Sequence, residues 1–150
     1  MLSVQSDEHF MKLALNEAQK AYEQDEVPVG AVVVCNGQVV GRGHNLTERL
    51  NDFTAHAEMQ AFTAASENLG NKYLNTCTLF VTLEPCHMCA GAAYWTQIGK
   101  IVFGAKDEKR GFTLLEQNIV HPKTKIVSGV MAEESAELLT TFFAEKRGSK

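Results

Sequence analysis

The strongest constraint on this 150-residue chain is a pair of thiols, Cys86 and Cys89, that follows the apolar run at 78–83. The run reads Thr-Leu-Phe-Val-Thr-Leu, which is typical of a buried strand. A helix that begins at Pro85 places the two cysteines one turn apart. The dipole and the free N–H groups at a helix start favour the thiolate form of cysteine, which is the form that binds metal. The segment therefore predicts a metal or redox site where a strand passes into a helix.

A second polar tract, Thr-Ala-His-Ala-Glu at 54–58, opens another segment with helical spacing thirty residues earlier. If the two helix starts meet at one end of the sheet, His56 completes a three-ligand set with Cys86 and Cys89. Such a set suits zinc and leaves the fourth tetrahedral position to water, whose pKa the metal lowers to about 7. Glu58 is then the natural proton carrier. A structural zinc or a redox dithiol is the alternative, but either would leave Glu58 without a role.

Length and composition predict a single domain over residues 1–150. The chain is 45% hydrophobic and 21% charged, as globular proteins are. Its first ten residues lack the apolar run of a signal peptide, and no stretch approaches the roughly 18 apolar residues that span a membrane. Four cysteines without such a leader favour a cytoplasmic location, where a C-x-x-C pair usually binds metal or catalyses. Cys35 and Cys77, in or beside strands, are expected to be small core residues.

Charge is distributed unevenly along the chain. The net charge is −4, yet residues 100–125 are rich in basic residues and residues 1–30 are rich in acidic ones. This asymmetry permits a phosphate-facing patch on an acidic body. The alternative is a set of solvated lysines on an ordinary surface.

The order of predicted elements indicates an α/β fold with three layers, α-β-α, around a central five-stranded mixed sheet. The opening hairpin should be antiparallel and the later, helix-linked strands parallel. Leu69 is expected to face inward, and Gly70 to end its helix. The expected helices cover 7–24, 55–69, 85 onward and 132–146, and the expected strands cover 29–34, 38–40, 78–83, 100–104 and 124–128, with 106–123 irregular or weakly helical.

Several motifs together make the chain similar to the bacterial tRNA-specific adenosine deaminases, which have the cytidine deaminase-like fold. The pattern H-x-E followed by P-C-x-x-C is typical of zinc nucleobase deaminases. The matching segments run over almost the whole sequence: 27–32, Asn45, 54–58, 82–86, 88–92, 104–107, 142–143 and 146–147. The resemblance implies a homodimer with one Zn²⁺ per subunit that converts the wobble adenosine of a tRNA anticodon to inosine.

The same resemblance assigns roles to individual residues. His56, Cys86 and Cys89 would bind zinc, and Glu58 would carry protons. The remaining positions would contact the anticodon stem-loop: Asn45 and the Ala57 backbone at the flipped base, Asp107 near the ribose, and the segment from Phe142 to Arg147 at the loop. Helical spacing predicts that Phe142 or Phe143 packs in the core, which leaves the other ring for stacking on RNA.

Two departures from the family pattern lie outside the metal motifs. Phe53 stands where the family usually has proline, and Ala144 with Glu145 interrupts the basic stretch near the C-terminus. Two other functions therefore stay open at this point. One is a deaminase of a free base or nucleoside, such as guanine or cytosine. The other is a non-catalytic RNA-binding module held together by zinc.

Overall fold

A single mixed sheet forms the centre of the computed structural model, which describes residues 6–148. Residues 1–5, which belong to the stretch examined for a signal peptide, and Lys150 therefore lie outside the described range. The strand order is β2-β1-β3-β4-β5. β1 pairs antiparallel with β2 and β3, while β3, β4 and β5 run parallel, as predicted. The strands are β1 (Gly30–Cys35), β2 (Gln38–His44), β3 (Cys77–Leu83), β4 (Lys100–Ala105) and β5 (Lys125–Val127).

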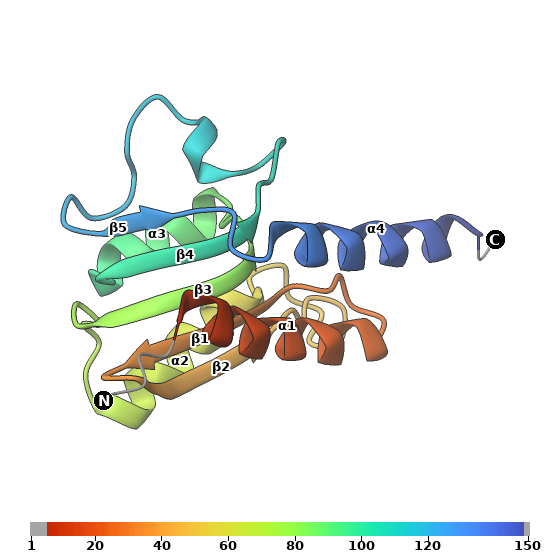
Figure 1. Ribbon diagram of the computed structural model, residues 1–150. Coiled ribbons are helices and arrows are strands. Elements are labelled where there is room, and N and C mark those ends of the chain that lie inside the picture. The colour runs from red at the N-terminus through yellow and green to blue at the C-terminus, as the bar shows by residue number, and fades with distance from the viewer. Residues whose placement is uncertain (1–5, 149–150) are drawn as a thin grey trace.

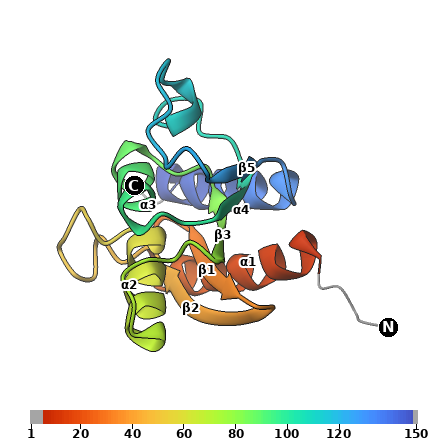
Figure 2. The same ribbon diagram turned by 90° about the vertical axis from the view of Figure 1, so that its left-hand side faces the viewer.

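Two helices cover each face of the sheet. α1 (Asp7–Glu23) and α4 (Ala132–Gly148) lie on one face, and α2 (Ala57–Leu69) and α3 (His87–Thr96) lie on the other (Figures 1 and 2). Successive strand residues point to opposite faces, so Ala31 and Val33 pack with α2 and α3, while Val32 packs on the α1 side. The predicted three-layer α-β-α fold is confirmed.

Glycines in β2 allow α2 to lie directly on the sheet. A Cβ at Gly43 would overlap the backbone of α2 at Ala57 and Ala61, and one at Gly41 would overlap the same helix one turn later. The sequence prediction ended this strand at residue 40, whereas the strand continues to His44. The close helix explains the difference, because strand glycines often mark a place where another backbone approaches.

Two local predictions about the helices were wrong. α3 begins at His87 rather than at Pro85, because Cys86 is the N-cap and the Pro85 carbonyl accepts a hydrogen bond from the Phe112 amide (3.0 Å). Leu69 is 41% exposed rather than buried, because it lies in the last turn of α2. The predicted stop at Gly70 is confirmed, with the left-handed backbone (φ 64°) that glycine adopts readily.

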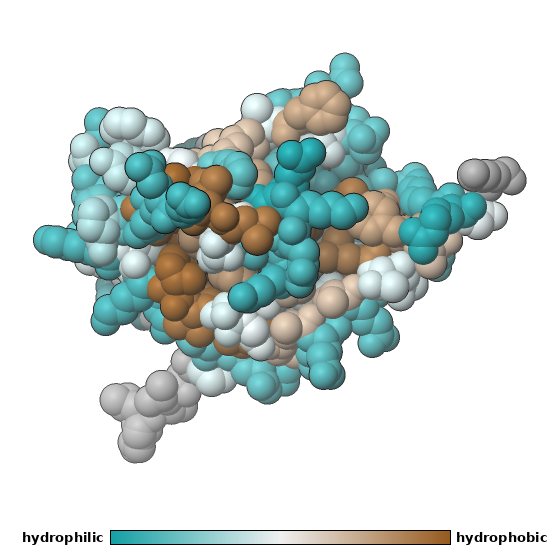
Figure 3. Space-filling model, turned by 90° about the horizontal axis from the view of Figure 1, so that it is seen from above, coloured by the Kyte–Doolittle hydropathy of each residue, from teal (hydrophilic) through white to brown (hydrophobic). Residues whose placement is uncertain are grey.

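The connection from β4 leads into β5, which is an edge strand of the sheet. This connection contains one short 3₁₀ helix (Phe112–Leu114), in a stretch that the sequence predicted to be irregular or weakly helical. Leu114, Leu115 and Ile126 are exposed here. Figure 3 shows the molecule from above the view of Figure 1, and hydrophobic residues gather among hydrophilic ones on this face. Across residues 6–148, no helix has the length and apolar character needed to cross a membrane.

Candidate active site

The first turns of α2 and α3 bring the predicted metal ligands together. His56 is the N-cap of α2 and Cys86 is the N-cap of α3, so both helix starts meet as expected. The His56 Nδ1 atom lies 3.6 Å from the Cys86 sulfur and 3.4 Å from the Cys89 sulfur. All three ligand atoms lie within 4.8 Å of one another. One imidazole and two thiols at this spacing fit a zinc ion with an open fourth position.

The electrostatics of the two thiols also suit a cation. Hydrogen bonds from Cys89 and from His56 lower the pKa of Cys86 to about 3, against the opposing effect of burial. The pKa of Cys89 is raised, chiefly by its hydrogen bond with Cys86 and then by burial. One thiolate is therefore favoured by the protein alone, and a metal ion stabilises the second because its charge deprotonates a coordinating thiol.

Glu58 is the second residue of α2, beside the three ligands, and only 4% of it is exposed. Burial raises the pKa of its carboxyl to about 7, while a backbone hydrogen bond and the nearby His56 act in the opposite direction. A carboxyl group with a pKa near neutrality can both accept and release a proton at physiological pH. The site therefore combines a metal-ligand set with a proton carrier.

A cavity of about 300 Å³ opens above these groups. Asn45, Ala57 and Asp107, which the sequence analysis expects to contact the substrate, line it. The Asn45 amide donates to the Val27 carbonyl (3.3 Å), and its oxygen accepts from the Thr47 amide (3.2 Å). Six further residues line the cavity, to which the sequence analysis assigned no role in the site: Val27, Val29, Thr47, Leu83, Glu84 and Arg110.

Asp107 stabilises a turn at the edge of the cavity. Its carboxylate accepts hydrogen bonds from the backbone amides of Lys109 and Arg110, both at 3.0 Å. These bonds hold a tight turn, which is the usual behaviour of aspartate at such a position. Phe53, the residue that replaces the family's proline, also lines the cavity and is 88% exposed.

The segment from Phe142 to Arg147 lies outside this cavity. Phe142 is buried, with its ring edge-on to Tyr22, whereas Phe143 is 43% exposed. The expectation that one of the two rings packs inside is confirmed, but the buried ring is the one named for contact with RNA. Arg147 is exposed on α4. A second hollow of about 500 Å³, lined by Phe142 and Lys146, shares Val27 with the cavity.

Other histidines and cysteines are not part of the metal set. His87 is exposed, and the only described group of three metal-ligating residues is His56, Cys86 and Cys89. Cys77 is buried as expected, and Cys35 is partly exposed at the end of β1.

Comparison with known proteins identifies the family of this chain. The family model of the cytidine and deoxycytidylate deaminase zinc-binding region matches residues 4–105. The tRNA-specific adenosine deaminase of Bacillus subtilis (strain 168) is 46% identical, with 96% of this chain and 92% of that protein covered. The protein of the same name from Agrobacterium fabrum (strain C58) is also 46% identical, over 93% of this chain and 95% of the relative.

Solved structures agree with this result. A chain from a study of A-to-I editing by tRNA:A34 deaminases at the wobble position of transfer RNA has a TM-score of 0.82 and 46% identity, over 87% of this chain and 99% of that chain. A guanine deaminase from Nitrosomonas europaea has a TM-score of 0.80 at 20% identity, over 95% of this chain and 87% of that one, and so shares the fold. The chain belongs to the zinc-binding cytidine and deoxycytidylate deaminase family and, within it, to the bacterial tRNA-specific adenosine deaminases.

Proposed function

We propose that this protein hydrolyses the wobble adenosine of a tRNA anticodon to inosine and releases ammonia. The observation that carries the proposal is the buried Glu58 beside His56, Cys86 and Cys89, at the base of a cavity of about 300 Å³. This arrangement occurs in a chain that is 46% identical to named tRNA-specific adenosine deaminases over nearly its full length. The whole of residues 1–150 would act as one deaminase domain.

The chemistry assigned to Glu58 is proton transfer. Zinc, when bound to His56, Cys86 and Cys89, supplies an activated water. Glu58 accepts the proton released as water adds to C6 of adenine, and gives this proton to the ring nitrogen N1. It then carries a second proton to the leaving amino group, so that one water enters and one ammonia departs. The burial that raises the pKa of Glu58 to about 7 supports both directions of transfer.

The size of the cavity supports a flipped nucleotide. A space of about 300 Å³ holds one base and part of its sugar, so the target must leave its stack. A loop base costs less to extrude than a paired one, which favours an anticodon loop over a duplex. Asn45 and the Ala57 backbone would contact the base, and Asp107 would lie near the ribose.

The rest of the anticodon stem-loop would extend over the second hollow toward α4. Phe143 has an exposed ring there, Lys146 lines the hollow, and Arg147 adds positive charge. We assign stacking to Phe143 rather than to the buried Phe142. Phosphate contacts from Arg147, and from Lys146 in exchange for its ion pair with Asp25, would make binding salt-dependent.

A homodimer is also part of this proposal. Trp95 is 75% exposed and Tyr94 is 40% exposed, side by side at the end of α3. Large exposed aromatic residues are enriched at protein interfaces. The small residues at 90–93 would allow close approach of a second copy.

A tRNA substrate would place the enzyme in the cytoplasm.

The decisive experiment is mass spectrometry of nucleosides after incubation with an anticodon stem-loop that contains a wobble adenosine. The zinc-loaded protein should produce inosine, and Glu58→Ala should retain zinc and produce none. If the wild-type protein binds zinc but yields no inosine, the proposal fails. Turnover of free guanine or cytosine would then indicate a free-base deaminase, and zinc-dependent RNA binding without any turnover would indicate a binding module.

A further inference from the structure

A buried carboxylate beside the site has no role in the chemistry described above. Glu84 directly follows β3, two residues before Cys86, and is only 2% exposed. Its Oε1 atom accepts a hydrogen bond from the Asp107 amide (3.0 Å). Its Oε2 atom accepts two more, from the Thr113 amide (2.8 Å) and the Thr113 hydroxyl (2.6 Å). One carboxylate thus binds two points, Asp107 and Thr113, of the loop that follows β4.

We call residues 106–114 the rim segment, because two of its members, Asp107 and Arg110, line the cavity. This segment also contacts the cysteine turn through the backbone. Gly111 forms an isolated antiparallel bridge with Cys86, and the Phe112 amide donates to the Pro85 carbonyl (3.0 Å). The rim segment is therefore attached directly to a metal ligand and its preceding residue.

Because Gly111 has no side chain, there is room beside it for the carboxylate of Glu84. A Cβ at this position would overlap the carboxyl carbon and both oxygens of Glu84. Since buried carboxylates are rare unless hydrogen-bonded, the three donors and the missing Cβ together describe a site built for this one group. An ionised carboxylate has acceptors only, which matches a set of N–H and O–H donors.

We propose that Glu84 is a positioning residue that fixes the rim segment against the cysteine turn and so sets the place of Asp107 and Arg110 at the substrate. The expected change in KM rests on the proposed deaminase function, whereas the role of Glu84 in holding the rim segment does not. Glutamine at this position would keep the shape and lose one acceptor, because its NH₂ group would face a donor. The rim segment would then loosen while the metal ligands stay in place.

The test compares Glu84→Gln with the wild-type protein at one zinc per chain. Losing a hydrogen bond to a charged group should raise KM for the stem-loop by about tenfold or more, with kcat changed less than about threefold. In hydrogen exchange, the amides of Asp107 and Thr113 should lose protection while peptides of α2 keep theirs. Gly111→Ala, which displaces the carboxylate, should change KM in the same direction.

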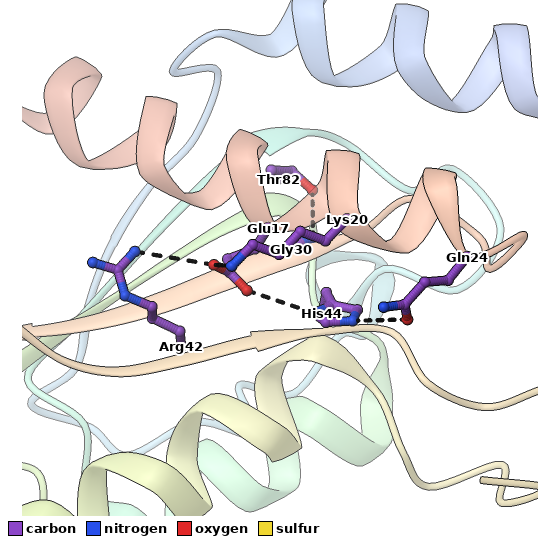
Figure 4. Close-up of polar contacts among 7 residues, drawn as sticks. All are labelled: Glu17, Lys20, Gln24, Gly30, Arg42, His44 and Thr82. Atoms are coloured by element: carbon purple, nitrogen blue, oxygen red, sulfur yellow. Dashed lines mark hydrogen bonds and ion pairs between the residues drawn. The ribbon is translucent and has the colours of Figure 1, made fainter. Parts of the chain in front are cut away.

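Glu17→Gln is the matched control. Glu17 is also a buried carboxylate, at 3% exposure, but it lies on α1 and contacts Lys20 (2.9 Å), His44 (3.5 Å) and Arg42 (4.0 Å), as Figure 4 shows. It does not line the cavity. This variant should lose stability without changing KM or the exchange of the rim segment. The control separates a general loss of buried charge from a loss of positioning.

If Glu84→Gln fails to fold, Thr113→Val replaces it, because this exposed residue loses only its hydroxyl donor. Thr113→Val should raise KM about threefold. Kinetic constants within twofold of wild type, together with unchanged exchange at Asp107, would overturn the inference. If the wild-type protein deaminates no RNA, the proposed function fails, and hydrogen exchange alone then decides the role of Glu84.

Discussion

The floor and the rim of the cavity are held in different ways. The floor consists of His56, Glu58, Cys86 and Cys89, which lie within the first turns of two helices packed on the sheet. The rim consists of loops, and buried carboxylates hold them. Glu84 accepts hydrogen bonds from the rim segment at 106–114, as described above.

A second buried carboxylate holds the opposite rim. Glu26 is 1% exposed and accepts hydrogen bonds from the amides of Glu48 (3.0 Å) and Arg49 (2.7 Å). These two residues belong to the loop between Asn45 and Phe53, which both line the cavity. Regular secondary structure thus fixes the reacting groups, whereas single side chains fix the loops that meet the substrate. We expect substitutions in the floor to abolish activity and substitutions in the rim to change affinity.

The largest effect should follow from removing a metal ligand. Cys89→Ser should lose zinc and lower turnover of the stem-loop by roughly 10³-fold or more, because the activated water is lost. Chelation of zinc from the wild-type protein should have the same effect, and added zinc should reverse it. The measurement is metal content by mass spectrometry beside inosine formation. Cys77→Ser, a change at a buried cysteine outside the metal set, should retain zinc; equal loss of zinc in both variants would contradict the assignment.

The next effect concerns two adjacent aromatic residues of α4. Phe142→Ala should lower the free energy of unfolding by about 3 kcal/mol, because the buried ring leaves a cavity. Phe143→Ala should cost less than about 1 kcal/mol and instead raise KM for the stem-loop. Urea unfolding at saturating zinc and steady-state kinetics measure the two quantities. The reverse pattern would show that the wrong ring was assigned to RNA.

A smaller effect should come from the contact between β2 and α2. Gly43→Ala places a Cβ against the α2 backbone at Ala57, next to Glu58, and should lower the free energy of unfolding by about 1–3 kcal/mol. We also expect kcat to fall, since the proton carrier moves with the helix. Gly148→Ala at the end of α4, where the added Cβ has open space, should change the free energy of unfolding by less than about 0.5 kcal/mol. Thermal unfolding of both variants tests the pair; equal destabilisation would contradict the close-approach argument.

The smallest effect belongs to a single surface charge. Arg147→Ala should leave kcat unchanged and weaken stem-loop binding a few-fold. The slope of log K against log salt should become less steep by about one. Binding titrations at several salt concentrations measure this slope. Lys12→Ala, a charge removal on the exposed side of α1, should leave it unaltered, and an identical change in both variants would mean that α4 has no special place in binding.

The sequence alone determined the element order, the mixed sheet and the metal set. His56, Glu58, Cys86 and Cys89 could be read from spacing because their chemistry is local. Each ligand lies at a helix start, and helix starts are visible as changes of periodicity next to polar residues. The left-handed stop at Gly70 was predictable for the same reason, since it depends on one residue's backbone freedom.

Only the tertiary structure decided which of two similar side chains is buried and what holds the rim. Helical spacing placed Phe142 and Phe143 on the same face, and packing against Tyr22 selected Phe142 for burial. The start of α3 at His87 depended on a hydrogen bond from Phe112, which is distant in the sequence. Glu84 accepts its hydrogen bonds from residues more than twenty positions away. No periodicity in the sequence encodes such pairs, because their energy comes from donors that meet the carboxylate only in the folded chain.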